Sequence, residues 1–151
     1  MKWASSYKVA AGLFLVAATV SLSPVQGAPA PSAAPPVALD YEYFKTKVQP
    51  VFVTKRTGHT RCVVCHTVNN ARFHLVPLSP GASMWNEEQS RQNFQLIQRV
   101  AIPGSLDSPI VKHPLAEDAG GDPHHGGAQQ FESQQDPAWQ TLRAFVMGER
   151  G

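Results

Sequence analysis

Both cysteines of this chain lie within the five residues Cys62-Val63-Val64-Cys65-His66. Two thiols separated by two residues, with an imidazole directly after the second, suit three kinds of site. They can form a disulfide redox pair, supply half of a zinc site or anchor a haem covalently. Each of these uses demands a different fold around residues 62–66, so the rest of the sequence can separate them.

Residues 1–27 have the layout of a secretory signal peptide. Lys2 and Lys8 precede an apolar run from Val9 to Val20, and small residues follow up to Gly27. The apolar run is short for a membrane span. We therefore predict a cleaved export signal, with an uncleaved membrane anchor as the alternative. Export would place the chain in the periplasm or another exported location, where disulfides persist and where bacteria attach haem of the c type.

Residues 28–38 read APAPSAAPPVA and predict a semi-rigid Pro/Ala-rich linker before a folded domain over residues 39–151. The chain has 13 Lys and Arg against 11 Asp and Glu. Lys2 and Lys8 of the predicted signal supply this excess of positive charge. The mature chain is therefore nearly neutral, and it lacks the concentrated basic face that nucleic-acid binding needs.

Apolar residues at helical spacing predict three main helices, the first of which starts after Asp40. Phe44, Val48 and Phe52 would share one face of this helix, and Asp40 suits its N-cap position. Pro50 lacks the N–H group that a helix interior uses. We therefore expect the helix to kink or to stop just before this proline.

Two further helices and long loops complete an expected all-α fold. The second helix is predicted over residues 85–101, and the last begins after Asp136. A short helical turn over residues 108–112 would have Asp107 as its cap, and residues 117–127 are too rich in glycine for regular structure. No segment shows the alternation of a strand. Loops this long need something to organise them, as a buried cofactor would.

The rest of the sequence favours haem over the other two uses of the cysteines. Thiol–disulfide motifs of this spacing usually lie in folds with a βαβ pattern. A structural zinc site needs four ligands, and His124 and His125 are adjacent rather than spaced as a second ligand pair. In c-type attachment, Cys62 and Cys65 would form thioethers to the two haem vinyl groups, and His66 would ligate the iron from the proximal side. The motif predicts one covalent haem c per chain.

Three stretches around the motif are distinctive: YFKTKVQPVF before it, NEEQSRQNFQLIQRVAIPGSLDSPIVKHPLAEDAGGDPHHGG after it, and DPAWQTLRAFVMG near the end. Together with CVVCH they resemble a group of small exported monohaem cytochromes c, related to the cytochrome-c-like domains of acidobacteria and planctomycetes. The resemblance covers most of the chain from about Asp40 onward. It implies a cytochrome c-like fold with three main helices around one haem, the first and last of them packed against each other.

The iron would need a distal ligand opposite His66, and cytochromes c usually supply Met or His. Met84 precedes the second predicted helix and Met147 ends the last one, so neither is well placed. In related domains the distal methionine comes from the loop before the last helix. In this chain that loop holds His125, followed by glycines that would let the backbone approach the haem closely. We expect His125 as the distal ligand and keep His113 as the alternative.

These residues predict a one-electron carrier of the cell envelope rather than an enzyme. With His66 and His125 on opposite sides, the iron would offer no position to a substrate. The expected partners are other redox proteins, and a membrane respiratory or photosynthetic complex is a candidate among them. Two alternatives stay open: an open-site haem protein that senses a gas or acts on peroxide, and a thiol–disulfide protein without haem.

Overall fold

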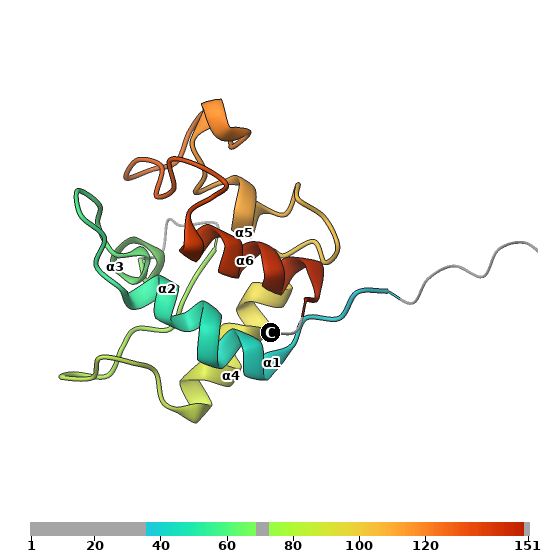
Figure 1. Cartoon of the computed structure of the whole chain (residues 1–151). Coiled ribbons are helices and arrows are strands. Elements are labelled where there is room, and N and C mark those ends of the chain that lie inside the picture. Colours follow the sequence, from blue (N-terminus) through green and yellow to red (C-terminus); the bar gives the residue numbers. More distant parts are fainter. Residues whose placement is uncertain (1–35, 69–72, 150–151) are drawn as a thin grey trace, which may run out of the picture. The chain divides into compact units, whose positions relative to one another are not determined.

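The computed structural model describes residues 36–68 and 73–149 of the chain (Figure 1). The chain divides into two units, Met1–Ala33 and Ala34–Gly151, and the first unit lies outside the described residues. The predicted signal peptide is therefore wholly outside the described part, and so is the predicted linker up to Pro35.

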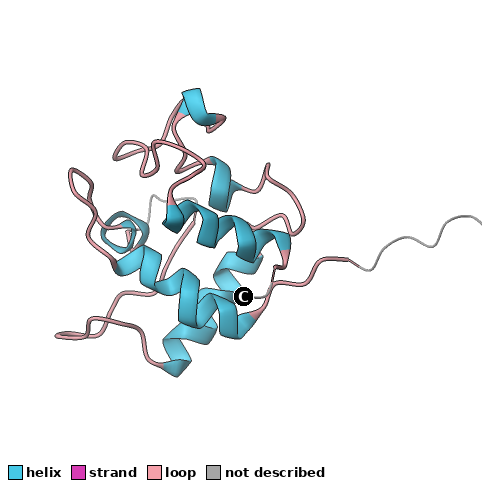
Figure 2. Ribbon diagram, viewed as in Figure 1, coloured by secondary structure: helices cyan, strands magenta, loops and turns pink. Residues whose placement is uncertain are grey.

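The described residues form helices and loops without a strand (Figure 2), which confirms the all-α prediction for this part of the chain. The only extended pairing among them is an isolated bridge between Leu115 and Phe131. None of the described helices is both long and apolar enough to cross a membrane. The elements in chain order are α1 (Tyr41–Tyr43), the π-helix η1 (Phe44–Val48), α2 (Gln49–Val53), α3 (Cys62–His66), α4 (Glu87–Gln98), α5 (Pro109–Lys112), the 3-10 helix η2 (Glu117–Ala119) and α6 (Pro137–Met147).

The first helix begins after Asp40, as predicted. Of the two outcomes expected at Pro50, a kink or a stop, the helix does not stop but passes through the proline. The Asp40 side chain accepts a hydrogen bond of 2.7 Å from the N–H group of Tyr43. The backbone then widens into η1 and returns to α-helical geometry in α2. A π-helical turn of this kind lets a helix pass an irregularity such as a proline with a local bend. Phe44 and Val48, on the predicted apolar face, are completely buried.

Helix α4 is shorter at both ends than the predicted span of residues 85–101. It begins after Asn86, which forms a reciprocal capping box with Gln89. Trp85 precedes this cap, and its buried ring donates a hydrogen bond of 2.7 Å from Nε1 to the carbonyl of Val76. The apolar side chain that resembled the start of the helix therefore anchors the preceding loop.

The short helix α5 is present, but the prediction that Asp107 caps it is wrong. Ser108 occupies the N-cap position, and its Oγ accepts a hydrogen bond of 3.0 Å from the N–H group of Ile102. The Asp107 carboxylate instead accepts a hydrogen bond of 2.9 Å from Lys112 Nζ. Farther along, the glycine-rich segment over residues 117–127 contains one short regular element, η2, where only loop was expected.

The first and last helices pack against each other through aromatic side chains. Phe44 of η1 lies 5.8 Å from Phe145 of α6 and 5.4 Å from Phe94 of α4, measured between ring centroids. Trp139 and Leu142 of α6 are also buried. Figure 1 shows α6 beside the first helix, with α4 packed on the same core. These contacts fix the positions of the helices on either side of the loops that carry the candidate site.

Asp136 caps α6 and connects it to the loop that precedes α3. Its Oδ1 accepts hydrogen bonds of 2.8 and 3.4 Å from the N–H groups of Ala138 and Trp139. Its Oδ2 forms an ion pair with Arg56, whose guanidinium lies 4.9 Å from the centroid of the Phe131 ring. Burial acts to raise the pKa of the Asp136 carboxyl, but the bonds from Arg56 and Ala138 outweigh it and lower this pKa below its usual value.

We expect Asp136→Ala to lower the free energy of unfolding at neutral pH by about 1 to 2 kcal/mol, mainly through loss of the N-cap. The folded-state pKa of Asp136 lies below the unfolded-state value, so its carboxylate stabilises the fold at neutral pH. That contribution is lost as the pH falls through the folded-state pKa. Urea unfolding measures this effect. Between neutral and acidic pH, the free energy of unfolding should fall more for the native chain than for Asp136→Ala.

Asp136→Asn is the matched control, because asparagine keeps the cap and removes only the charge. Its stability at neutral pH should lie between those of the other two proteins. Equal losses of stability on acidification in the native chain and in Asp136→Ala would contradict the role given to this carboxylate.

Candidate functional site

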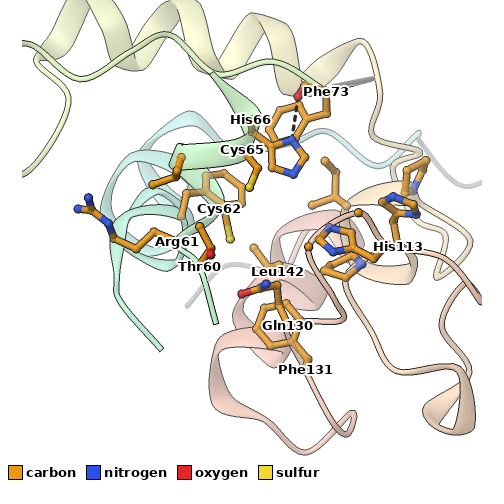
Figure 3. A pocket seen from close by; sticks show the side chains of 18 of the residues that line it. Thr60, Arg61, Cys62, Cys65, His66, Phe73, His113, Gln130, Phe131 and Leu142 are labelled. Atoms are coloured by element: carbon orange, nitrogen blue, oxygen red, sulfur yellow. Dashed lines mark hydrogen bonds between the residues drawn. The ribbon is translucent and has the colours of Figure 1, made fainter. Parts of the chain in front are cut away.

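The motif at residues 62–66 forms one helical turn, α3, that turns both cysteines to the same side. Cys62 and Cys65 are three residues apart and therefore neighbours on the helix surface. Val63 points into the core and is only 5% exposed. Neither thiol is part of a disulfide. Figure 3 shows both sulfur atoms and the His66 ring projecting from this turn into one common space.

That space is a cavity of about 850 Å³, here called the α3 cavity, and its volume suits a bound cofactor. Its apolar walls come from elements far apart in the sequence, with Phe52 on α2, Ile110 on α5 and Leu142 on α6. The structure brings all the predicted site residues to this one cavity. They are Cys62, Cys65, His66, His113 and His125.

The Nε2 atom of His66 is free to act as a ligand to a metal ion. Its Nδ1 lies 2.8 Å from the carbonyl oxygen of Phe73, which can only accept a hydrogen bond (Figure 3). Nδ1 therefore carries the proton, and the lone pair is on Nε2. The Phe73 ring also contacts His66, at 5.0 Å between centroids. Burial lowers the pKa of His66, which favours the neutral imidazole that binds metals.

The pKa of Cys62 is shifted in the opposite direction from that of a catalytic redox cysteine. Burial raises the pKa of the Cys62 thiol to about 11, so this side chain stays protonated at neutral pH. Catalytic cysteines of thiol–disulfide proteins have lowered pKa values, because the thiolate is the reacting form.

His125 reaches the α3 cavity from the loop between η2 and α6. Its Nδ1 lies 2.7 Å from the carbonyl oxygen of Ala128, so Nε2 again holds the lone pair. The same residues close a turn through a backbone hydrogen bond of 3.0 Å, with Gly127 at a φ of 93°. A Cβ atom on Gly127 would lie 3.9 Å from Cys65 Sγ, so the loop passes close to α3. Ala128 also has a positive φ, of 67°, which non-glycine residues seldom adopt.

The spacing of His66 and His125 fits two ligands on opposite sides of one metal ion. Their ring centroids are 6.3 Å apart, and their planes differ by 33°. A metal–imidazole bond of about 2 Å, together with about 1 Å from the nitrogen to the ring centre, gives roughly 6 to 6.5 Å for such a pair. This spacing is compatible with two imidazoles that ligate one metal ion, as the predicted haem iron would require. Neither Met84 nor Met147 lines the α3 cavity.

His113 also lies in the cavity, beside His125. Its ring centroid is 4.8 Å from that of His125, which is too short for these two histidines to be the ligands on opposite sides of one metal ion. Its Nδ1 lies 3.2 Å from Asp122 Oδ2. Figure 3 shows His113 across the cavity from Cys65 and His66.

Within residues 36–68 and 73–149, no cluster of three or more His, Cys, Asp or Glu side chains is arranged to hold a metal ion. Comparison with protein-family models, with curated proteins and with solved structures found no match to the chain.

Three groups that orient the histidines were not predicted from the sequence. The carbonyl oxygens of Phe73 and Ala128 belong to the backbone, so no side-chain pattern indicates them. Asp122 is a side chain, but it lies nine residues from His113, a separation that indicates contact in no regular element. The glycines after His125 were the one sequence feature that pointed to a close approach of this loop.

Proposed function

We propose that residues 39–151 form a c-type monohaem cytochrome with a cytochrome c-like fold, which carries one electron at a time in the cell envelope. The observation that carries this proposal is the arrangement around the α3 cavity. Two thiols on one helical turn face a cofactor-sized space. The same space is lined by two imidazoles, each with a free Nε2, whose ring centroids are 6.3 Å apart.

Cys62 and Cys65 would hold the cofactor covalently. Each thiol would add across one vinyl group of the cofactor, with the sulfur on one vinyl carbon and the thiol hydrogen on the other. The double bond would become a single bond, and no electron would be gained or lost overall. Two attachment points on one turn of α3 fix the cofactor relative to His66.

His66 and His125 would fill both axial positions through Nε2. The haem iron supplies a one-electron couple between its ferrous and ferric forms. With both positions held by side chains, no site at the metal is left for a substrate, which agrees with an electron carrier rather than an enzyme. Two imidazoles give a lower reduction potential than an imidazole with a methionine thioether.

The expected setting follows from the export signal and the balanced charge. An exported, nearly neutral domain would meet other redox proteins in the periplasm, either free or as subunits of a membrane complex, through a small transient surface. Little net charge implies little electrostatic steering, so the rate of association should depend weakly on salt.

Absorption spectroscopy tests the closed site on protein produced in the periplasm together with the haem-attachment machinery. We expect low-spin spectra in both the ferric and the ferrous state, with no methionine–iron band and no change when carbon monoxide is added. A high-spin ferric spectrum with ready carbon monoxide binding would contradict the closed site and would favour the gas-sensing or peroxide-linked alternative.

A further inference from the structure

The ring of His113 packs edge-to-face against the ring of His125. The two centroids are 4.8 Å apart, and the ring planes meet at 68°. Aromatic rings favour this arrangement because the positive edge of one meets the negative face of the other. The glycines that follow His125 are exposed and have no side chain that could contact its ring. His113 therefore supplies a side-chain contact to an imidazole that comes from an otherwise exposed loop.

His113 can act as a firm support because it is itself held in place. Its Nδ1–H donates to Asp122 Oδ2 at 3.2 Å. The N–H group of Asp122 in turn donates to the carbonyl of Lys112, also at 3.2 Å. His113 directly follows Lys112 at the end of α5, a helix that packs on α6 through the hydrogen bond of 2.9 Å from Trp139 Nε1 to Val111. The support thus extends from His125 to the helical core.

The two imidazoles are restrained in matching ways. His66 donates Nδ1–H to the Phe73 carbonyl and contacts the ring of the same residue. His125 donates Nδ1–H to the Ala128 carbonyl and contacts the ring of His113. Each therefore has one hydrogen bond and one aromatic contact. Groups of this kind orient metal-bound histidines and tune the metal.

We propose that His113 is a positioning residue that fixes the plane of the His125 imidazole and keeps it at about the observed 33° to the plane of His66. This inference rests on the function proposed above. A metal–imidazole bond permits rotation of the ring about its own axis, so the ring plane is set by neighbouring groups. The His113 ring blocks this rotation from one side, and the Ala128 carbonyl limits it from another.

Electron paramagnetic resonance of the ferric protein reports the angle between the two ligand planes. Nearly parallel imidazoles give a rhombic low-spin spectrum, whereas nearly perpendicular ones give a single signal at large g. From the 33° between the rings, we expect a rhombic spectrum for the native chain. His113→Ala should stay low-spin with covalent haem, but its spectrum should broaden or shift toward the large-g form.

Two further variants separate positioning from a general structural effect. His113→Phe restores an aromatic ring without a metal-binding atom, so it should return the spectrum toward that of the native chain. His124→Ala removes an exposed imidazole that does not line the α3 cavity, and it should leave the spectrum unchanged.

The outcomes distinguish this inference from the proposed function. A native chain without covalent haem would overturn both. Haem-loaded, low-spin His113→Ala with an unchanged spectrum would overturn the positioning role alone. A high-spin spectrum in both His113→Ala and His113→Phe would also overturn it, because His113 would then be the distal ligand. If His113→Ala does not accumulate, His113→Leu takes its place, because leucine keeps bulk at this position without an aromatic ring. An unchanged spectrum in haem-loaded His113→Leu would then overturn the role of the aromatic contact.

Discussion

Cys62→Ala combined with Cys65→Ala should leave a chain that releases all of its haem on denaturation. These are the only thiols of the protein, and both face the α3 cavity, so no other side chain can form the thioethers. His66 and His125 would still be able to ligate the iron, and the folded variant should therefore bind haem reversibly. Haem staining of a denaturing gel should be strong for the native chain and absent for the double variant.

Single cysteine variants give the intermediate case. Cys62→Ala and Cys65→Ala should each retain one thioether. After denaturation in pyridine, each should show a haem absorption band between those of unattached and doubly attached haem. Thr67→Ala is a matched control, since this residue directly follows the motif and does not line the cavity. It should keep the native stain. Covalent haem in the double variant would contradict the role of the cysteines.

His125→Ala should convert the six-coordinate low-spin haem into a five-coordinate high-spin form that binds carbon monoxide. This variant removes the imidazole at the distance from His66 that suits a ligand on the opposite side of the iron. The α3 cavity presents no methionine to replace it, because Met84 and Met147 lie elsewhere. Absorption spectra before and after addition of carbon monoxide measure the change. We expect most of the low-spin signal to be lost.

His113→Ala is the comparison that decides between the two candidate distal ligands. It should remain low-spin and unreactive to carbon monoxide, because the ring of His125 would still lie at the centroid distance of 6.3 Å from His66 that suits the second ligand. The reverse pattern, with a low-spin His125→Ala and a high-spin His113→Ala, would show that the distal assignment is wrong.

The helices were predictable because their signals are local. Asp40 and Asp136 cap the first and last helices as expected, since an N-cap needs only a side chain near its own backbone. At Pro50 the sequence left open whether the helix would kink or stop. It continues, and Phe44 and Val48, the first and last residues of η1, are both completely buried. Asp107 failed as a cap because the neighbouring Ser108 takes that position and a distant N–H group takes its hydroxyl.

The candidate site also has a part that the sequence predicts and a part that depends on how the chain folds. Cys62, Cys65 and His66 follow from a spacing that one helical turn imposes, and the structure places all three on one cavity. Which histidine faces His66 depends on how a glycine-rich loop folds back over α3, and only the structure gives that distance. The support from Asp122 through His113 arises where α5 and this loop meet, so it had no signal in the sequence.

The central claim is that this chain carries one haem bound through both thiols, and the mass of the denatured native protein tests it most directly. The protein should be produced with residues 1–27, the predicted export signal, in cells that contain the haem-attachment machinery. We predict a mass that exceeds that of the polypeptide alone by one haem, with a pyridine absorption band typical of two thioethers. A known cytochrome c matured in the same cells is the positive control. If that control carries haem, a colourless protein with the mass of the polypeptide alone would contradict the claim.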